Sequence, residues 1–165
     1  HEAGDAPPQA AWAALAPLVD SAFANLATLR AGERPEDLHA MRISVKRLRY
    51  AVELLKAAFV SDHRTLVNDL AALQETLGSY RDHMLLEEIV SRRLSRLSER
   101  GRRTLVEGLI GPVDTLVAKR HAEYTAFVRK TGGLSAAAVG RRIRTALGLP
   151  EAAAAEEGGS EQPGR

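Results

Sequence analysis

The strongest constraint on the fold of this chain is the periodicity of residues 38–56. At 100° per residue on a helix, one apolar stripe consists of Leu38, Met41, Val45, Leu48, Val52 and Leu55. Beside it lies a second, almost entirely basic stripe, which consists of His39, Arg42, Lys46, Arg49, Glu53 and Lys56. The segment therefore predicts a bundle helix with a core face and an adjoining row of cations.

The row of cations is costly for a helix unless something offsets it. Like charges three or four residues apart destabilise a helix by roughly 0.2–0.5 kcal/mol per pair. Because the row adjoins the core stripe, its long side chains should stand at the edge of the packing interface and point into a shared groove. A polyanion would fit such a groove. The alternative is a solvated face on which the apolar stems lean on their neighbours.

Two motifs in this chain resemble the signatures of the CHAD family, the conserved-histidine α-helical domains. The first is Leu-His-x-x-Arg-Ile-x-x-Lys-Arg-Leu-Arg-Tyr-x-x-Glu, read from Leu38 to Glu53. The second is Leu-Gln-Glu-Thr-Leu-Gly-Ser-Tyr-Arg-Asp, at residues 73–82. The resemblance implies an all-helical fold with a basic channel that binds inorganic polyphosphate, in proteins associated with polyphosphate granules.

The chain departs from the family pattern in one respect. A full domain of this family has two similar helical halves, each with its own His-and-Arg helix, whereas this chain carries one such helix, which resembles that of the second half. Two arrangements stay open. Either two copies of the chain form a homodimer about a twofold axis and rebuild the channel, or the chain is a piece of a larger protein and its groove is open.

Composition and charge narrow the class of protein. The length fits one domain, and the absence of cysteine excludes disulfides and thiolate metal sites. No apolar run approaches the roughly 18 residues of a membrane span, so no membrane partner is expected and the location should be cytoplasmic, on polyphosphate granules where those form. Residues 9–150 hold 22 Lys and Arg against 15 Asp and Glu, an excess that attracts anions.

The helix start and stop signals predict an all-α, up-and-down bundle of about five to six helices. Residues 1–8 and 150–165 are expected to be disordered, and residues 9–149 to form the domain, with 135–147 as a short and loosely packed appended helix. Pro17 should kink or start the first helix, and Pro35 should start the second, which runs to about Phe59. Gly111 and Pro112 should break or kink a later helix.

A turn is predicted inside the second motif. Gly78 should end one helix and Ser79 should cap the next, with Asp82 in the capping-box position. Arg81 would then lie in the first turn of that helix, where free N–H groups favour an anion. The far end of the same helix carries a dense basic cluster that includes Arg92, Arg93 and Arg96.

The function predicted from these observations is binding of inorganic polyphosphate without catalysis, with no catalytic residue, metal or cofactor. The expected phosphate contacts are His39, Arg42, Lys46, Arg49, Tyr50, Arg81, Arg92, Arg93, Arg96, Lys119 and Arg120. His63, His83 and His121 are interpreted as surface residues. A nucleic-acid-binding module is less favoured because aromatic residues are few. An accessory domain of a triphosphate- or polyphosphate-cleaving enzyme and a plain scaffold stay as alternatives.

Overall fold

The computed structural model describes residues 7–150, and every element in that part of the chain is helical, which confirms the all-α prediction. The elements are α1 (Pro8–Phe23), α2 (Leu26–Ala31), α3 (Pro35–Leu54), the 3-10 turn η1 (Lys56–Ala58), α4 (His63–Glu99), α5 (Arg103–Thr131) and α6 (Ala136–Ala146). The ends predicted to be disordered are residues 1–8 and 150–165; residues 1–6 and 151–165 of them lie outside the described residues, and Pro8 is already part of α1.

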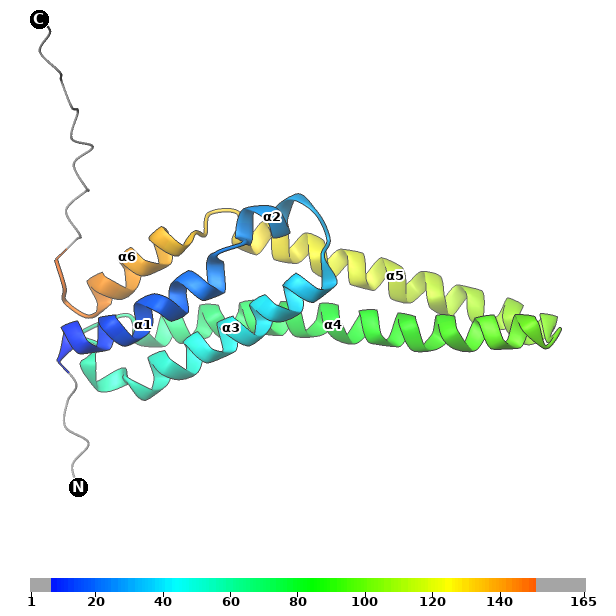
Figure 1. Cartoon of the computed structure of the whole chain (residues 1–165), viewed down its shortest axis with the longest axis horizontal. Coiled ribbons are helices and arrows are strands. Elements are labelled where there is room, and N and C mark those ends of the chain that lie inside the picture. Colours follow the sequence, from blue (N-terminus) through cyan, green and yellow to red (C-terminus); the bar gives the residue numbers. More distant parts are fainter. Residues whose placement is uncertain (1–6, 151–165) are drawn as a thin grey trace, which may run out of the picture.

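The helices α4 and α5 form a long antiparallel hairpin around which the fold is arranged (Figure 1). Helix α3 packs on α4, α1 packs on α3 and α6, and α2 packs on α5, and in Figure 1 these shorter helices lie along the half of the hairpin that holds the start of α4 and the end of α5. The other half of the hairpin projects beyond them. The molecule is therefore a helical bundle with a two-helix extension, and not a bundle of equal helices.

The signature helix α3 forms as the sequence predicted. Pro35 occupies its first turn, where its missing N–H costs nothing, and Glu36 and Asp37 follow at the positive end of the helix dipole. The apolar stripe is buried, as shown by Leu38, Met41, Val45, Leu48 and Val52. Full burial of each such side chain contributes about 1.5–3 kcal/mol. The helix ends at Leu54, five residues before the predicted end at Phe59, and the 3-10 turn η1 follows it.

The first apolar segment differs from its prediction in two ways. Helix α1 begins at Pro8 and runs through Pro17, so the predicted start at Pro17 was wrong, and the segment breaks at Asn25, between α1 and α2. The 24 residues Pro8–Ala31 are also long and apolar enough to qualify as a candidate membrane span, so the expectation that no run approaches that length was wrong. In the structure this segment buries Leu15, Val19 and Phe23 in the core of the bundle.

The turn predicted inside the second motif does not exist. Helix α4 continues through Gly78, so the Ser79 cap and the capping-box role of Asp82 were wrong. A glycine inside a helix costs about 1 kcal/mol relative to alanine, and the burial of Leu77 and Tyr80 on either side outweighs that cost. The packing of α4 along one face therefore outweighs the local helix-stop signal of Gly78.

The later helices correct two further predictions. Helix α5 contains Pro112 without a break. Ser135 caps α6 as predicted, since its hydroxyl accepts a 3.0 Å hydrogen bond from the Ala138 N–H. The helix is not loosely packed, because its apolar side is buried against α1 and because Arg144 lies 5.4 Å above the ring of Trp12.

Candidate functional site

The two signature motifs lie side by side, because α3 and α4 pack antiparallel to each other. Their register follows from the approach of Arg42 to Gly78, and it agrees with two shared pockets, one lined by Glu36 and Met84 and the other by Glu53 and Val67. This register brings His39 level with Arg81. We call the line formed by His39, Arg42, Lys46, Arg49 and Arg81 the basic strip.

Gly78 explains how the basic strip can lie so close to α4. A Cβ atom built on this glycine would stand 3.5 Å from Nε of Arg42, so the guanidinium of Arg42 lies directly over the glycine backbone. Arg42 is half-buried in consequence. The glycine of the second motif therefore serves as a contact surface for the arginine of the first, and not as a helix stop.

Several polar atoms along the basic strip are withdrawn from water without a protein partner. Among the described residues, His39 Nδ1, Arg42 Nε and Arg49 Nε are buried and make no hydrogen bond, and the same holds for Gln74 Oε1 on α4. A buried polar atom that is left unsatisfied costs about 1–3 kcal/mol. The packing of α3 on α4 thus buries these three nitrogen atoms without a protein acceptor for them in the described residues.

Tyr50 acts as a platform beneath two cations of the strip. Lys46 Nζ lies 5.5 Å and Arg49 Cζ lies 4.7 Å from the centre of the Tyr50 ring. Both distances permit cation–π attraction, and the ring is 49% exposed. Arg49 also pairs with Glu53 at 3.5 Å. Tyr50 therefore packs against two cations of the strip, and its role as a phosphate contact stays a prediction.

The strip is electrostatically unbalanced. Within the described part of the chain, Arg42, Lys46 and Arg81 form no ion pair. Arg81 reaches the strip for a different reason from the one predicted: it lies in the middle of α4, where no free N–H groups are present, and it is half-buried level with His39. An anion-binding helix start at this position was therefore wrong.

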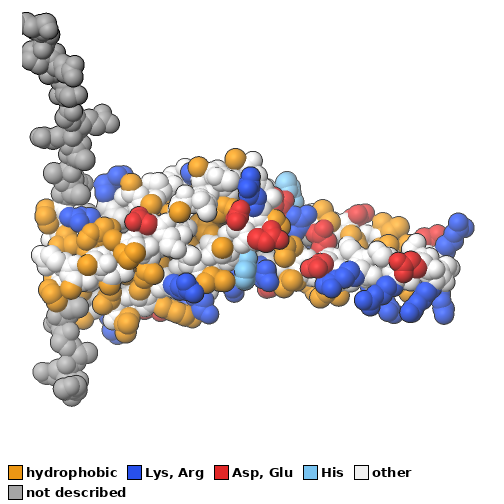
Figure 2. Space-filling view, in the orientation of Figure 1, with side chains coloured by type: hydrophobic (Ala, Val, Ile, Leu, Met, Phe, Trp, Pro, Cys, Tyr) orange, Lys and Arg blue, Asp and Glu red, His pale blue; other side chains and the backbone are white. Residues whose placement is uncertain are grey.

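Arg92, Arg93 and Arg96 form a separate surface, which we call the distal patch. All three are exposed on the projecting half of α4, and the axial distance from Arg81 to Arg92 is about 16 Å at 1.5 Å per residue. Arg92 pairs with Glu88 at 3.1 Å. Figure 2 shows Lys and Arg side chains gathered at the free end of the hairpin.

An acidic pocket of about 500 Å³ lies between the basic strip and the distal patch. It is lined by Pro35, Glu36, Met84, Glu87, Glu88, Ser91 and Arg120. A smaller pocket of about 320 Å³ lies at the opposite end of the strip, with Lys56, His63 and Arg64 among its lining residues. The basic surface is therefore divided in two, and the acidic pocket separates its parts.

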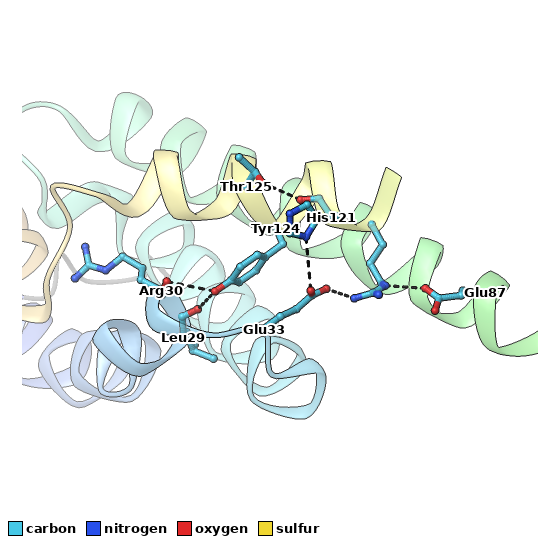
Figure 3. A network of polar contacts seen from close by, with 8 residues as sticks. Leu29, Arg30, Glu33, Glu87, His121, Tyr124 and Thr125 are labelled. Carbon is cyan, nitrogen blue, oxygen red and sulfur yellow. Dashed lines mark hydrogen bonds and ion pairs between the residues drawn. The ribbon is translucent and has the colours of Figure 1, made fainter. Parts of the chain in front are cut away.

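Arg120 is a largely buried, ion-paired residue and is not part of the exposed basic surface. Its guanidinium donates to Glu33 and, at 2.7 Å, to Glu87, and all three side chains are at least 75% buried (Figure 3). Burial lowers the pKa of Arg120, but the hydrogen bond to Glu87 and the charges of both carboxylates outweigh it, so that the pKa is raised. Lys119, by contrast, is exposed.

The same network ties the loop before α3 to the hairpin. Tyr124 donates a 2.8 Å hydrogen bond to the carbonyl of Leu29, and His121 Nδ1 lies 3.9 Å from the second oxygen of Glu33 (Figure 3). His121 is otherwise exposed, as predicted. His83 was predicted on the surface, but it is half-buried in α4 and its Nδ1 is buried without a partner in the described residues.

The buried Tyr80 gives this network a pH dependence. Burial, reinforced by the neighbouring Glu33 carboxylate, raises the pKa of Tyr80 from 10.0 to about 12. The folded state thus holds the phenolic proton more tightly than the unfolded state. The resulting stability is fully present below pH 10 and is lost between pH 10 and 12, by about 2–3 kcal/mol. Denaturant unfolding at pH 9, 10, 11 and 12 measures this loss.

A matched variant controls that measurement. Tyr80→Phe removes the titrating hydroxyl but keeps the ring. Among the described residues, the Tyr80 hydroxyl has no hydrogen-bond partner, so the substitution breaks no hydrogen bond. The variant should lose less stability than the wild type between pH 10 and 12. An identical loss in both proteins would show that Tyr80 does not control this pH dependence.

Within residues 7–150, no group of three or more His, Cys, Asp or Glu side chains could hold a metal ion. The model of the CHAD domain family matches residues 1–91, which is more than half of the chain and includes both motifs that form the strip. The chain belongs to the CHAD family. No curated protein and no solved structure matches it.

The family match has a clear boundary in the structure. CHAD domains are known from polyphosphate-related proteins. The matched residues include all of α1 to α3 and most of α4, but they end at Ser91, one residue before the distal patch. The basic strip therefore lies within the CHAD region, whereas the distal patch and all of α5 lie beyond it.

Proposed function

We propose that this CHAD chain binds inorganic polyphosphate along the basic strip. The observation that carries the proposal is the antiparallel alignment of the two signature motifs. It brings His39, Arg42 and Lys46 of α3 level with Arg81, Gly78 and Gln74 of α4, in that order. Arg42, Lys46 and Arg81 form no ion pair in the described chain. A linear polyanion would supply the missing negative charges along the same line.

Binding on this proposal is neutralisation of a phosphate backbone. Each contact from a Lys or Arg side chain releases counterions from the polymer, as in nucleic-acid binding, so affinity should fall with salt concentration. Arg42 and Arg49 present planar donors that suit phosphate oxygens, while Lys46 acts as a mobile point charge above Tyr50. His39 would contact the polymer through the part of its ring that stays exposed. The proposed role is retention of the polymer and not its cleavage.

The other predicted contacts have smaller roles on this proposal. Arg120 is not among the proposed phosphate contacts, because its guanidinium already pairs with Glu33 and Glu87. Arg92, Arg93 and Arg96 lie beyond the acidic pocket, so they would contact only a polymer long enough to pass Glu36 and Glu88. Lys119 is exposed on α5 and would add to the general positive field.

Calorimetric titration of long-chain polyphosphate into the wild type and into Arg42→Ala/Lys46→Ala/Arg49→Ala tests the proposal. We expect binding by the wild type and a loss of at least 100-fold in the triple variant, since each charge-assisted hydrogen bond contributes about 1.5–3 kcal/mol. Titrations at low and moderate salt should show weaker binding as salt rises.

The control ligands are orthophosphate and duplex DNA. Orthophosphate should bind weakly, because a single phosphate contacts only part of the strip. DNA that binds as tightly as polyphosphate, or a triple variant that binds like the wild type, would show that the strip is not a polyphosphate site. Circular dichroism of the triple variant should confirm an unchanged helix content.

A further inference from the structure

Helix α5 carries one heptad seam along its whole length, and only half of it is covered. The positions at alternating spacings of three and four are Val106, Ile110, Val113, Val117, Arg120, Tyr124, Phe127 and Thr131. The C-terminal half is covered: Phe127 and Thr131 are buried, and Tyr124 bonds to the Leu29 carbonyl. In the N-terminal half, Ile110 is 48% and Val117 is 36% exposed.

The neighbouring helix completes a flat face beside this uncovered seam. Ser91 lines the pocket at the base of the hairpin together with Arg120, so it lies on the same side as the seam. Ser95 and Ser98 follow Ser91 at spacings of four and three, and both are exposed. The projecting half of the hairpin thus presents an apolar ridge from α5 and a row of small side chains from α4. Such a face permits close approach of another helix pair.

The two ends of this face carry opposite charges. At the free end, Arg103 precedes Val106 by three residues and therefore stands on the seam, next to Arg102. At the base lies the acidic pocket, where Glu87 pairs with Arg120 and Glu88 with Arg92, while Glu36 forms no ion pair in the described chain. In Figure 2, basic side chains gather at the free end with a few acidic ones among them, and further acidic side chains lie nearer to the bundle.

We propose that two copies of this chain pair antiparallel through the projecting face of the α4–α5 hairpin. A twofold axis near the middle of the seam would place Ile110 against the partner's Val113, and Val106 against the partner's Val117. Arg103 would then lie at the acidic pocket of the partner. The overlap from 103 to 120 is about 26 Å long at 1.5 Å per residue, and the two hairpins together make a four-helix bundle.

The charges decide the direction of the pairing. A parallel alignment would bring together two free ends that each carry six arginines, Arg92, Arg93, Arg96, Arg100, Arg102 and Arg103. The antiparallel alignment instead places each free end beside the carboxylates of the other copy. Glu107 and Asp114 flank the seam, and in this register Glu107 of one copy comes close to Asp114 of the other. Their repulsion weakens the pairing that the apolar ridge provides.

Sedimentation analysis without polyphosphate tests this pairing independently of the proposed function. The wild type should form a concentration-dependent dimer between about 1 and 200 μM. Ile110→Glu should be monomeric over the same range, because a charge would enter the centre of the apolar ridge. Ile89→Glu is the matched control: Ile89 is 57% exposed on α4, away from the seam, and its variant should dimerise like the wild type.

A charge exchange tests the antiparallel direction. Arg103→Glu and Glu36→Arg should each weaken the dimer, and the double variant should recover most of the lost affinity, because it restores opposite charges across the interface. Asp114→Asn should strengthen the dimer. A wild type that stays monomeric at 200 μM, a dimer that survives Ile110→Glu, or a double variant that is no better than either single one would overturn the proposal.

Discussion

Arg120→Met should destabilise the folded protein by about 3–5 kcal/mol. The substitution removes the one cation between Glu33 and Glu87 and leaves two largely buried carboxylates without a counterion. Because Glu33 belongs to the loop before α3 and Glu87 to α4, the same change loosens the joint that holds the signature helix against the hairpin. Denaturant unfolding at neutral pH measures the loss as a shift of the midpoint.

The matched control for Arg120 is Arg92→Met. Arg92 pairs with Glu88, but both side chains are more than half exposed, and such pairs contribute about 0–1 kcal/mol. Arg120→Met/Glu33→Gln/Glu87→Gln should recover part of the stability, since it removes the unpaired charges. If Arg120→Met costs no more than Arg92→Met, the network does not hold the fold together.

Arg42→Glu/Arg49→Glu should abolish measurable polyphosphate binding, with a loss of more than about 100-fold in affinity. Each reversal removes a phosphate contact and adds repulsion on the line where the polymer is proposed to lie. Arg42 has no ion pair in the described chain, and Arg49 has only the 3.5 Å pair with Glu53. Titration at constant ionic strength, with chains of two lengths, measures the loss.

Arg47→Glu distinguishes the strip from the net charge of the chain. Arg47 is exposed on the same helix but outside the strip, so its reversal should lower affinity less than about 3-fold. A second control, Arg93→Glu, changes the distal patch and should affect only the longer polymer. Equal losses in all of these variants would mean that the protein binds polyphosphate through its overall positive field.

The sequence by itself determined the helical class and the strip on α3. The periodicity of Leu38, Met41 and Val45 leaves one side of α3 apolar, and the cations must then lie beside it whatever α3 packs against. Pro35 and Ser135 also marked helix starts correctly, because caps depend on neighbours in the chain.

Only the tertiary structure decided what Gly78 and Arg120 do. A glycine signals a helix end in isolation, but at position 78 α4 is held along its length by α3 and α5, and the missing Cβ admits Arg42. Arg120 had the same appearance in the sequence as Lys119, yet the fold brings Glu33 and Glu87 to it from distant segments. Burial and charge pairing depend on contacts between remote residues, which local spacing along the chain does not encode.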